Sequence, residues 1–584
     1  MTYAHTSRNV LLLGGLATLL CASQLRDAAA CGCFTPPDPS VPVVQAGERI
    51  VFAMQNGEVV AHIQIQYQGD ASEFGWLLPL PSLPTLELGT DELFNQLTSQ
   101  TQPKYRLTRK YEGNCLFQSG RGFGGSSSGP PSPGGEDAGG GGGPLVVQGA
   151  IGPYDYAVLH ADSKDPMLQW LSDNHYFVPA GTDATVGPYI HTGAYFLALK
   201  LRSGQSTGDL QPVVVRYPSD LPMIPIVLTS VGAKPHMGIQ VWMLGAGRAI
   251  PRNYYHTVVN DALVDYSNGG QNYNDLITKA VGESIGKHSF VTEFAGASSV
   301  MKNILNYPGR FGSNSELAAQ PDATSFVQYL YSHGYGQINR SQGPFGGGVT
   351  LTSQLIAILS RYIPEPPVMA QHGVTADQWF QSLSYYLTPQ YQQQHPGDFA
   401  GWAGINYQPA QMATEIDQRV VQPTLQAAAL FDTYPYLTRM YSTLSPEDMN
   451  KDPVFSYNAG LPDYKNVHDA TLTYHCGMLV PSANASTTPA TLLTEQGWVV
   501  EFPGGVGSGS IAASWGLPGS WRIEILREEG GPEVVTDNTS RIRDALGTGG
   551  CSVALGGRTE GMLGAAMLAA LALGLALALR RRGE

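Results

Sequence analysis

The sequence predicts an α+β protein with a strand-rich N-terminal domain, a helical middle region, a short C-terminal strand segment and a single C-terminal transmembrane helix. Three observations predict this fold class. Short runs of alternating apolar and polar residues recur before residue 256. Runs with helix-capping signals dominate from residue 257 to about residue 444. An uncharged apolar stretch, 561–579, stands just before the C-terminus.

Length and charge indicate how many domains to expect and which partners to exclude. The chain has 584 residues, more than one compact core usually holds, so several domains are expected. Only 14% of residues are charged, so much of the surface must be built from uncharged polar residues and the 29 tyrosines. The formal net charge is -14, and no basic stripe with interleaved aromatic residues stands out. A nucleic-acid partner is therefore not expected.

The first elements follow from periodicity and capping. In EVVAHIQIQYQGD, Ala61 and Ile63 alternate with His62 and Gln64, which predicts a half-buried strand. FGWLLPLPSLP predicts a proline-broken edge strand. TDELFNQLTSQ predicts a short helix capped by Thr90.

A Gly-, Ser- and Pro-rich stretch, 119–144, predicts a disordered insert. Within it, GSSSG matches the GxSxG expression of a nucleophile elbow. The strand and helix that such an elbow requires are missing around it, so no nucleophile is assigned there.

A helix from about Pro166 to Asp173 is predicted after the insert. Four strands are then expected, in AYFLALKLR, QPVVVRYP, MIPIVLTSVG and MGIQVWMLG. The helical region includes DATSFVQYLYSHG, which ends at Gly334, and TADQWFQSLSYYL, where Thr375 and Gln378 form a capping box. The helical region is expected to continue through PAQMATEIDQRVV and TLQAAALFDTYPYLTRMYSTL. Strands return in TLLTEQGWVVEFP and SWRIEILREE, and a Gly-Gly pair predicts a hairpin turn before PEVV.

Both ends of the chain carry targeting signals. Residues 1–30 contain an apolar run, Val10–Ala22, and small residues at Ala28 and Ala30. This is the pattern of a secretory signal peptide cleaved between Ala30 and Cys31. A lipoprotein acylated on Cys31 is the alternative reading.

At the other end, residues 561–579 are expected to form a helix of about 28 Å, close to the thickness of a bilayer core. The basic tail 580–584 follows and is expected on the cytoplasmic side. About ten residues upstream stands Gly-Cys-Ser around Cys551. This arrangement resembles the MYXO-CTERM sorting tag, which implies processing and lipidation at Cys551 and display on the cell surface. A plain single-pass anchor is the alternative.

Cysteine usage fits an oxidising compartment. Four cysteines remain after the signal peptide and Cys551 are set aside: Cys31, Cys33, Cys115 and Cys476. Four exported thiols usually pair, in one of three connectivities. A bond between Cys31 and Cys33 would close a very tight ring, so each of them is expected to pair with Cys115 or Cys476. The alternative for Cys476 is a reactive thiol beside His475.

Motifs for metals and cofactors are weak. VHDATLTYHC holds the densest cluster of histidines, but strand alternation puts His468 and His475 on opposite faces. The oxygen-rich loop 265–275 does not match an EF-hand. Phosphate-binding motifs do not occur, and no spacing singles out a catalytic triad. We therefore predict no metal and no cofactor.

Several blocks resemble a known family. One block is similar to the opening of the bacterial domain of unknown function (DUF) 2330 family: CGCFTPPDPSVPVVQAGERIVFAMQNGEVVAHIQIQYQGDASEFGWLLPLPS. Later blocks of the same family resemble four further stretches of this chain: GPYDYAVLHADS, VGAKPHMGIQVWMLG, FVTEFAG and PYLTRMYSTLSPEDMNKDPVFSYN. The resemblance therefore extends over most of residues 31–480. The glycine-rich insert and the compact CGC depart from the family pattern. The resemblance implies an exported, often anchored protein and assigns no catalytic residues.

These observations divide the chain into nine parts. They are 1–30 signal peptide, 31–118 first β-rich part, 119–144 insert, 145–256 second β-rich part, 257–475 helix-rich region, 476–545 C-terminal strands, 546–560 sorting motif and spacer, 561–579 membrane helix and 580–584 cytoplasmic tail.

The predicted function is a non-catalytic binding or structural module of the cell envelope, exported and anchored at the cell surface or outer membrane. Its expected partners are the membrane, through the C-terminal helix or a lipid on Cys551, and an envelope protein or glycan. The alternative is an extracellular hydrolase whose site is assembled from distant residues. His62, His475 and Cys476 are its first candidates.

Overall fold

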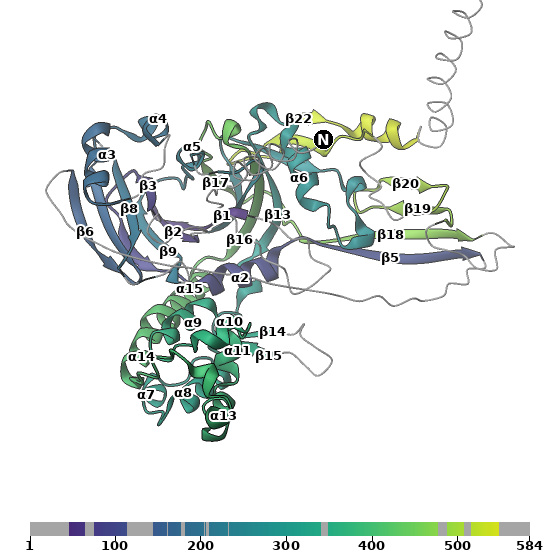
Figure 1. Cartoon of the computed structure of the whole chain (residues 1–584). Helices are drawn as coiled ribbons and strands as arrows, with labels where there is room; N and C mark the ends of the chain where they lie inside the picture. The colour runs from purple at the N-terminus through teal and green to yellow at the C-terminus, as the bar shows by residue number, and fades with distance from the viewer. Residues whose placement is uncertain are drawn as a thin grey trace, which may run out of the picture.

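The computed structural model describes residues 46–64, 75–113, 144–160, 162–176, 182–203, 205, 209–231, 233–339, 348–476, 487–506 and 516–547. The predicted signal peptide, nearly all of the glycine-rich insert, the sorting motif and the predicted membrane helix lie outside these ranges. Within them, no helix is long and apolar enough to cross a bilayer. The described part is a mixed α/β protein with a strand-rich N-terminal region (Figure 1).

The largest element is a mixed ten-stranded sheet, here called the central sheet. Its order is β22 (Glu533–Asp537), β21 (Ser520–Ile525), β12 (Tyr255–Val259), β13 (Ser289–Ala297), β16 (Tyr436–Leu444), β10 (Met237–Gly245), β1 (Ala46–Gln55), β2 (Glu58–Gln64), β9 (Val213–Pro218) and β4 (Thr85–Leu88). β1 and β10 are parallel, with Ile50 opposite Val241. The β1–β2 hairpin turns at Asn56 and Gly57, which both have positive φ, as a type I′ turn requires. The sheet thus joins strands from both ends of the described sequence.

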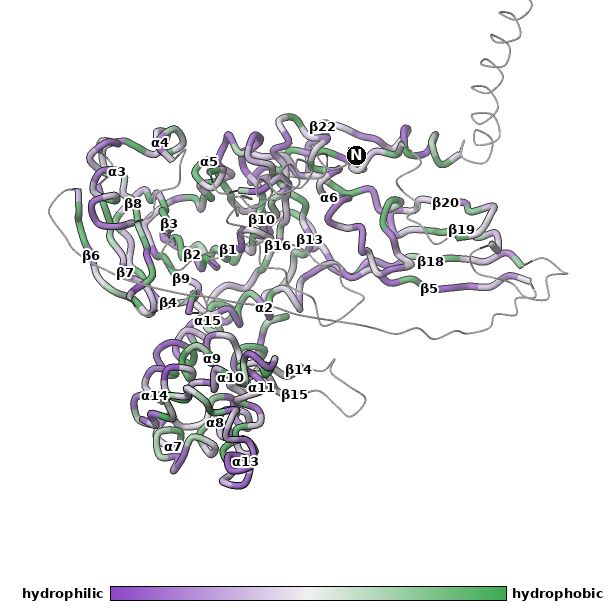
Figure 2. The backbone as a smooth tube through the Cα atoms, viewed as in Figure 1, coloured by the Kyte–Doolittle hydropathy of each residue, from purple (hydrophilic) through white to green (hydrophobic). Residues whose placement is uncertain are grey.

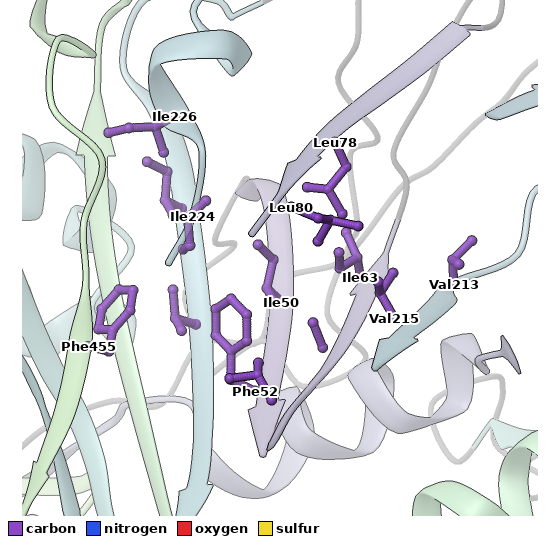
Figure 3. Close-up of a cluster of buried hydrophobic side chains, with 14 of the residues drawn as sticks. Ile50, Phe52, Ile63, Leu78, Leu80, Val213, Val215, Ile224, Ile226 and Phe455 are labelled. Atoms are coloured by element: carbon purple, nitrogen blue, oxygen red, sulfur yellow. The ribbon is translucent and has the colours of Figure 1, made fainter. Parts of the chain in front are cut away.

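A second sheet packs face to face on one end of the central sheet. Its order is β3 (Gly75–Leu80), β8 (Tyr195–Leu201), β7 (Tyr154–His160) and β6 (Leu145–Ile151). Figure 3 shows Ile50 and Phe52 of β1 and Leu78 and Leu80 of β3 among the side chains of one shared apolar core. β3 is an edge strand, as its proline predicts. Two short helices, α3 (Lys164–Asp173) and α5 (Ile226–Thr229), pack on the outer face, and α4 (Thr182–Thr185) lies against α5.

A third sheet extends from the other side of the molecule (Figure 1). Its order is β20 (Val499–Phe502), β19 (Ala490–Leu493), β18 (Val467–Cys476) and β5 (Lys104–Gly113). One face packs with α6 (Tyr273–Gly282) in a common core. The predicted alternation in β18 is confirmed, because Ala470, Leu472 and Tyr474 are buried in that core.

Helices between β13 and β16 form a separate lobe, seen beneath the sheets in Figure 1. They are α7 (Asn314–Ala318), α8 (Ala323–Ser332), α9 (Ser353–Ser360), α10 (Pro367–Gln371), α11 (Ala376–Gln381), α12 (Leu383–Tyr386), α13 (Pro389–Gln394) and α14 (Pro409–Ile416). Their buried apolar residues form a core of their own. The capping box at Thr375 and Gln378 is confirmed. Figure 2 shows hydrophilic colour at α13, at the far end of the lobe.

Two short ribbons and two further helices complete the described structure. β11 (Arg248–Pro251) pairs with β17 (Phe455–Asn458), and β14 (Gln337–Asn339) pairs with β15 (Gly348–Thr350). α2 (Asp91–Thr101) is capped by the Thr90 side chain, as predicted. A π-helical turn, Asp417–Val421, leads into α15 (Gln422–Thr433), which returns to the central sheet.

Three expectations from periodicity are wrong. β2 is buried on both faces rather than half-buried, because α2 and α15 cover the face that carries His62. MIPIVLTSVG contains α5 instead of a strand. PYLTRMYSTL is not helical but forms β16, which is held between β10 and β13. In each case contacts with distant parts of the chain override the local pattern.

Candidate functional site

A polar pocket lies where the third sheet meets the central sheet. Its volume is about 440 Å³, within the range of small-molecule sites. We call it the polar pocket; its wall includes Tyr105, Asp261, Glu293, Tyr464, His468 and Glu495. These side chains come from five segments of the chain, and most of them can donate or accept hydrogen bonds.

Asp261 supplies an unused acceptor in this pocket. It opens a short 3₁₀ turn, Asp261–Leu263, after the capping residue Asn260. The backbone N–H of Gln496 donates to its Oδ2 at 2.9 Å. Its Oδ1 is buried and has no hydrogen-bond partner among the residues that the structure describes. Burial raises the pKa of Asp261 to about 6, so its carboxyl changes charge near neutral pH.

A second group of charged side chains also lines the pocket. His468 Nδ1 lies 3.1 Å from Glu495 Oε2, and Lys465 Nζ lies 2.5 Å from Glu495 Oε1. The hydrogen bond from His468, together with Lys465, lowers the pKa of Glu495 to about 2. The imidazole stacks on Tyr105, with ring centroids 5.3 Å apart. His468 is therefore held in place by both a carboxylate and an aromatic face.

Glu293, which lines the pocket, belongs to a buried ion pair. Arg439 Nε donates to Glu293 Oε2 at 2.5 Å, and the Tyr273 hydroxyl donates to Glu293 Oε1 at 2.8 Å. Arg439 Nη2 also donates to Gln240 Oε1 at 2.9 Å. Both oxygens of Glu293 are engaged, so Arg439 balances the charge of this carboxylate.

A hydroxyl that lines the pocket is hydrogen-bonded to an imidazole, and the imidazole in turn contacts a carboxylate. Thr292 lines the pocket, and its Oγ1 lies 3.1 Å from His256 Nε2. His256 Nδ1 lies 3.1 Å from Glu524 Oε2. Burial lowers the pKa of His256, which favours the neutral imidazole. This is the hydrogen-bond order of a nucleophilic triad, although Thr292 is only 1% exposed and also accepts from Arg248 Nη2 at 3.2 Å.

The three residues expected to form a hydrolase centre are not brought together. His62 lies in β2 of the central sheet, whereas His475 and Cys476 end β18 of the third sheet. His475 faces solvent and contacts Glu112 at 3.0 Å and Thr491 at 2.9 Å. Cys476 is disulfide-bonded, so it offers no reactive thiol.

His62 is buried between β1 and β9 and is only 2% exposed. Neither ring nitrogen has a hydrogen-bond partner within the described ranges. Burial, with a smaller effect of Arg216, lowers its pKa to about 3. His62 is therefore a neutral core residue.

The remaining sequence candidates divide into two groups. Ala30, Cys31, Cys33, Cys115 and Cys551 lie outside the described residues. In the loop 265–275, Asp265 instead caps a 3₁₀ turn, accepting from the Asn268 N–H and side chain. No group of three or more His, Cys, Asp and Glu side chains in the described part of the chain is placed to hold a metal ion.

Sequence reasoning found one member of the polar pocket and missed the others. The VHDATLTYHC motif drew attention to His468, and the structure confirms that His468 and His475 face opposite sides of β18. Glu495, 27 residues away from His468, gives no local signal. Asp261 and Gln496 are 235 residues apart, and only the fold brings them together.

Comparison with known proteins gives one similarity. Residues 26–309 match the DUF2330 family model, described as an uncharacterized protein conserved in bacteria. No curated protein and no solved structure matches the chain. The family match ends just before α7, where the helical lobe begins, so β16 and β18 lie beyond it. The sequence blocks after residue 309 that resemble the family are likewise outside the match.

Proposed function

We propose that this chain, similar over residues 26–309 to a bacterial family, is an exported, surface-anchored binding module. Its ligand is a small, neutral, polyhydroxylated molecule of the sugar class, held in the polar pocket. Export and anchoring are inferred from the sequence of residues 1–30 and 546–584. The ligand class is inferred from the pocket, and one observation carries it: a buried acceptor oxygen of Asp261 without a hydrogen-bond partner among the described residues.

Charge balance in the pocket favours a neutral ligand. Glu495 is paired with Lys465 and His468, and Glu293 is paired with Arg439. These two carboxylates are therefore already balanced, and Asp261 remains to bind a ligand. A hydroxyl group would only have to donate one hydrogen bond to Asp261, which removes the cost of an unpartnered buried acceptor.

Aromatic faces favour a ring-shaped ligand with apolar edges. Tyr105, Tyr464 and Trp521 all line the polar pocket. Such side chains combine a broad apolar surface with a polar tip, which suits sugars and similar compounds. The pocket volume of about 440 Å³ suits one or two sugar rings rather than a polymer running through it.

Calorimetry with neutral sugars tests the ligand class. The probes are glucose, galactose, N-acetylglucosamine and their β-1,4-linked dimers, titrated into the full chain. Asp261→Asn turns one acceptor into a donor and should weaken binding about tenfold, the effect of losing one good hydrogen bond. Asp469→Asn is the matched control, because Asp469 is exposed on the other face of β18. Failure of every sugar to bind, or equal losses in both variants, would contradict the proposal.

Export and anchoring need a separate measurement. Intact mass is determined for protein isolated from its own cells, with thiols alkylated before and after reduction. A chain that begins at Cys31 and ends near Cys551 with added lipid mass agrees with surface display. A tail intact through Glu584 would instead indicate a plain membrane anchor.

A second candidate function is hydrolysis, favoured by the aligned Thr292, His256 and Glu524. In that case Thr292 would be the nucleophile, His256 the general base and Glu524 the group that orients the imidazole. An active-site-directed fluorophosphonate probe would then label the wild type and spare Thr292→Val. Absence of labelling, with sugar binding intact, supports the binding module.

A further inference from the structure

A second cavity, distinct from the polar pocket, lies between the central and second sheets. Its volume is about 350 Å³. We call it the apolar cavity; its wall includes Ile50, Phe52, Ile63, Leu78, Leu80 and Tyr217. Figure 3 shows the side chains of β1, β2 and β3 that converge on this region. Water gains few hydrogen bonds on such a surface, so an apolar ligand is favoured there.

One end of the apolar cavity is acidic. Glu48 and Asp452 both line it. Asp452 Oδ1 accepts from the Tyr189 hydroxyl and from the Val227 N–H, both at 3.0 Å. Glu48 Oε2, in contrast, is buried and has no hydrogen-bond partner in the described part of the structure.

Among the described residues, no lysine or arginine lines the cavity beside these carboxyl groups. The other titratable residues of this described lining are Tyr189, His191 and Tyr217. Burial, reinforced by Asp452 and partly offset by a hydrogen bond from Thr229, raises the pKa of Glu48 to about 7. The carboxyl group is thus held in a place where its charged form lacks stabilisation.

We propose that the apolar cavity binds a small molecule with an apolar body and a primary ammonium group, which pairs with Glu48. The apolar body replaces water between the two sheets. The ammonium group supplies a positive charge and a hydrogen-bond donor for Glu48 Oε2, and such charge-assisted bonds are the strong ones in proteins. Because β1 and β3 belong to different sheets, an occupant would also join the two sheets across their shared core.

Three probes that share a chain length and differ only in their head group test this proposal. Hexylamine, hexanol and hexanoate are titrated into the full chain at pH 8, where an alkyl ammonium stays protonated. Trp76 lines the cavity, so its fluorescence reports occupancy alongside calorimetry. Hexylamine should bind about tenfold more tightly than hexanol. Equal binding of hexanol, preferential binding of hexanoate, or no binding at all would overturn the proposal.

A pair of matched variants tests whether the preference for hexylamine depends on Glu48. Glu48→Gln keeps the shape and removes the charge, so hexylamine should lose its advantage over hexanol. Glu58→Gln makes the same chemical change at an exposed position of β2 and should leave binding unchanged. Thermal unfolding of each variant checks that it folds. If Glu48→Gln does not fold, the comparison of hexylamine, hexanol and hexanoate on the wild type still tests the proposal. Both variants retaining tight hexylamine binding would overturn the role of Glu48.

Discussion

Replacement of His62 by leucine should stabilise the protein, and increasingly so as the pH falls. His62 is opposite Val51 and Val214 in the register of the central sheet, on the face covered by α2 and α15. Its ring nitrogens are buried without hydrogen-bond partners among the described residues. An unpartnered buried polar group costs about 1–3 kcal/mol, so His62→Leu should raise the free energy of unfolding by about 1 kcal/mol at pH 7.

The pH dependence adds a second, larger effect. The folded-state pKa of His62 is about 3, below the value of about 6.5 expected in the unfolded chain. The unfolded state therefore binds one more proton between these values, and stability is lost as the pH falls below about 6.5. At about 1.4 kcal/mol per pH unit well below that point, this loss reaches about 2 kcal/mol between pH 7 and pH 5. Leucine does not titrate, so the advantage of the variant should grow by that amount.

Urea unfolding of the full chain at pH 7, 6 and 5 measures both effects. Val60→Ala is the matched control, because Val60 lies on the same face of β2 and carries no titratable group. Its destabilisation should be the same at each pH. A destabilised His62→Leu, or an advantage that does not change with pH, would refute the reasoning. Either result would mean that the imidazole has a bound water or another partner.

Three further predictions concern the core, a covalent link and a helix cap. Glu293→Gln leaves buried Arg439 without its partner and should cost about 3 kcal/mol or more in urea unfolding; a loss below about 1 kcal/mol would contradict this. Because Gly113 is opposite Cys476 and Cys115 follows two residues later, non-reducing peptide mapping should link Cys115 to Cys476, not to the N-terminal cysteine pair. Thr375→Ala removes the capping box and should cost about 1 kcal/mol, seen as faster amide exchange in α11; unchanged exchange would argue against it.

Local signals in the sequence identify many elements correctly. Thr90 and Thr375 cap α2 and α11 as predicted, because a cap depends on residues only a few positions away. α8 ends near Gly334, which has a positive φ of 70°. These features form wherever the rest of the chain lies, so the sequence alone is enough to predict them.

Elements that depend on distant contacts are harder to predict. β16 pairs with β10 and β13 along its length, and this pairing decides against the helix that its sequence suggests. The residues that line the two cavities could not be predicted from the sequence for the same reason. Glu48 and Asp452 are far apart in the sequence yet line one cavity, and Asp261 meets Gln496 across 235 residues. Periodicity and motif spacing carry no information about such pairs.

The helical lobe leaves and re-enters the central sheet at one place. Ala297, at the end of β13, pairs directly with Tyr436, at the start of β16. The chain between them makes a long excursion and returns to the strand beside the one it left. The helices from α7 to α14 therefore form an insertion between two neighbouring strands, and a short connection in their place would keep β13 and β16 in register. α15 would have to remain, because it covers the face of β2 that carries His62.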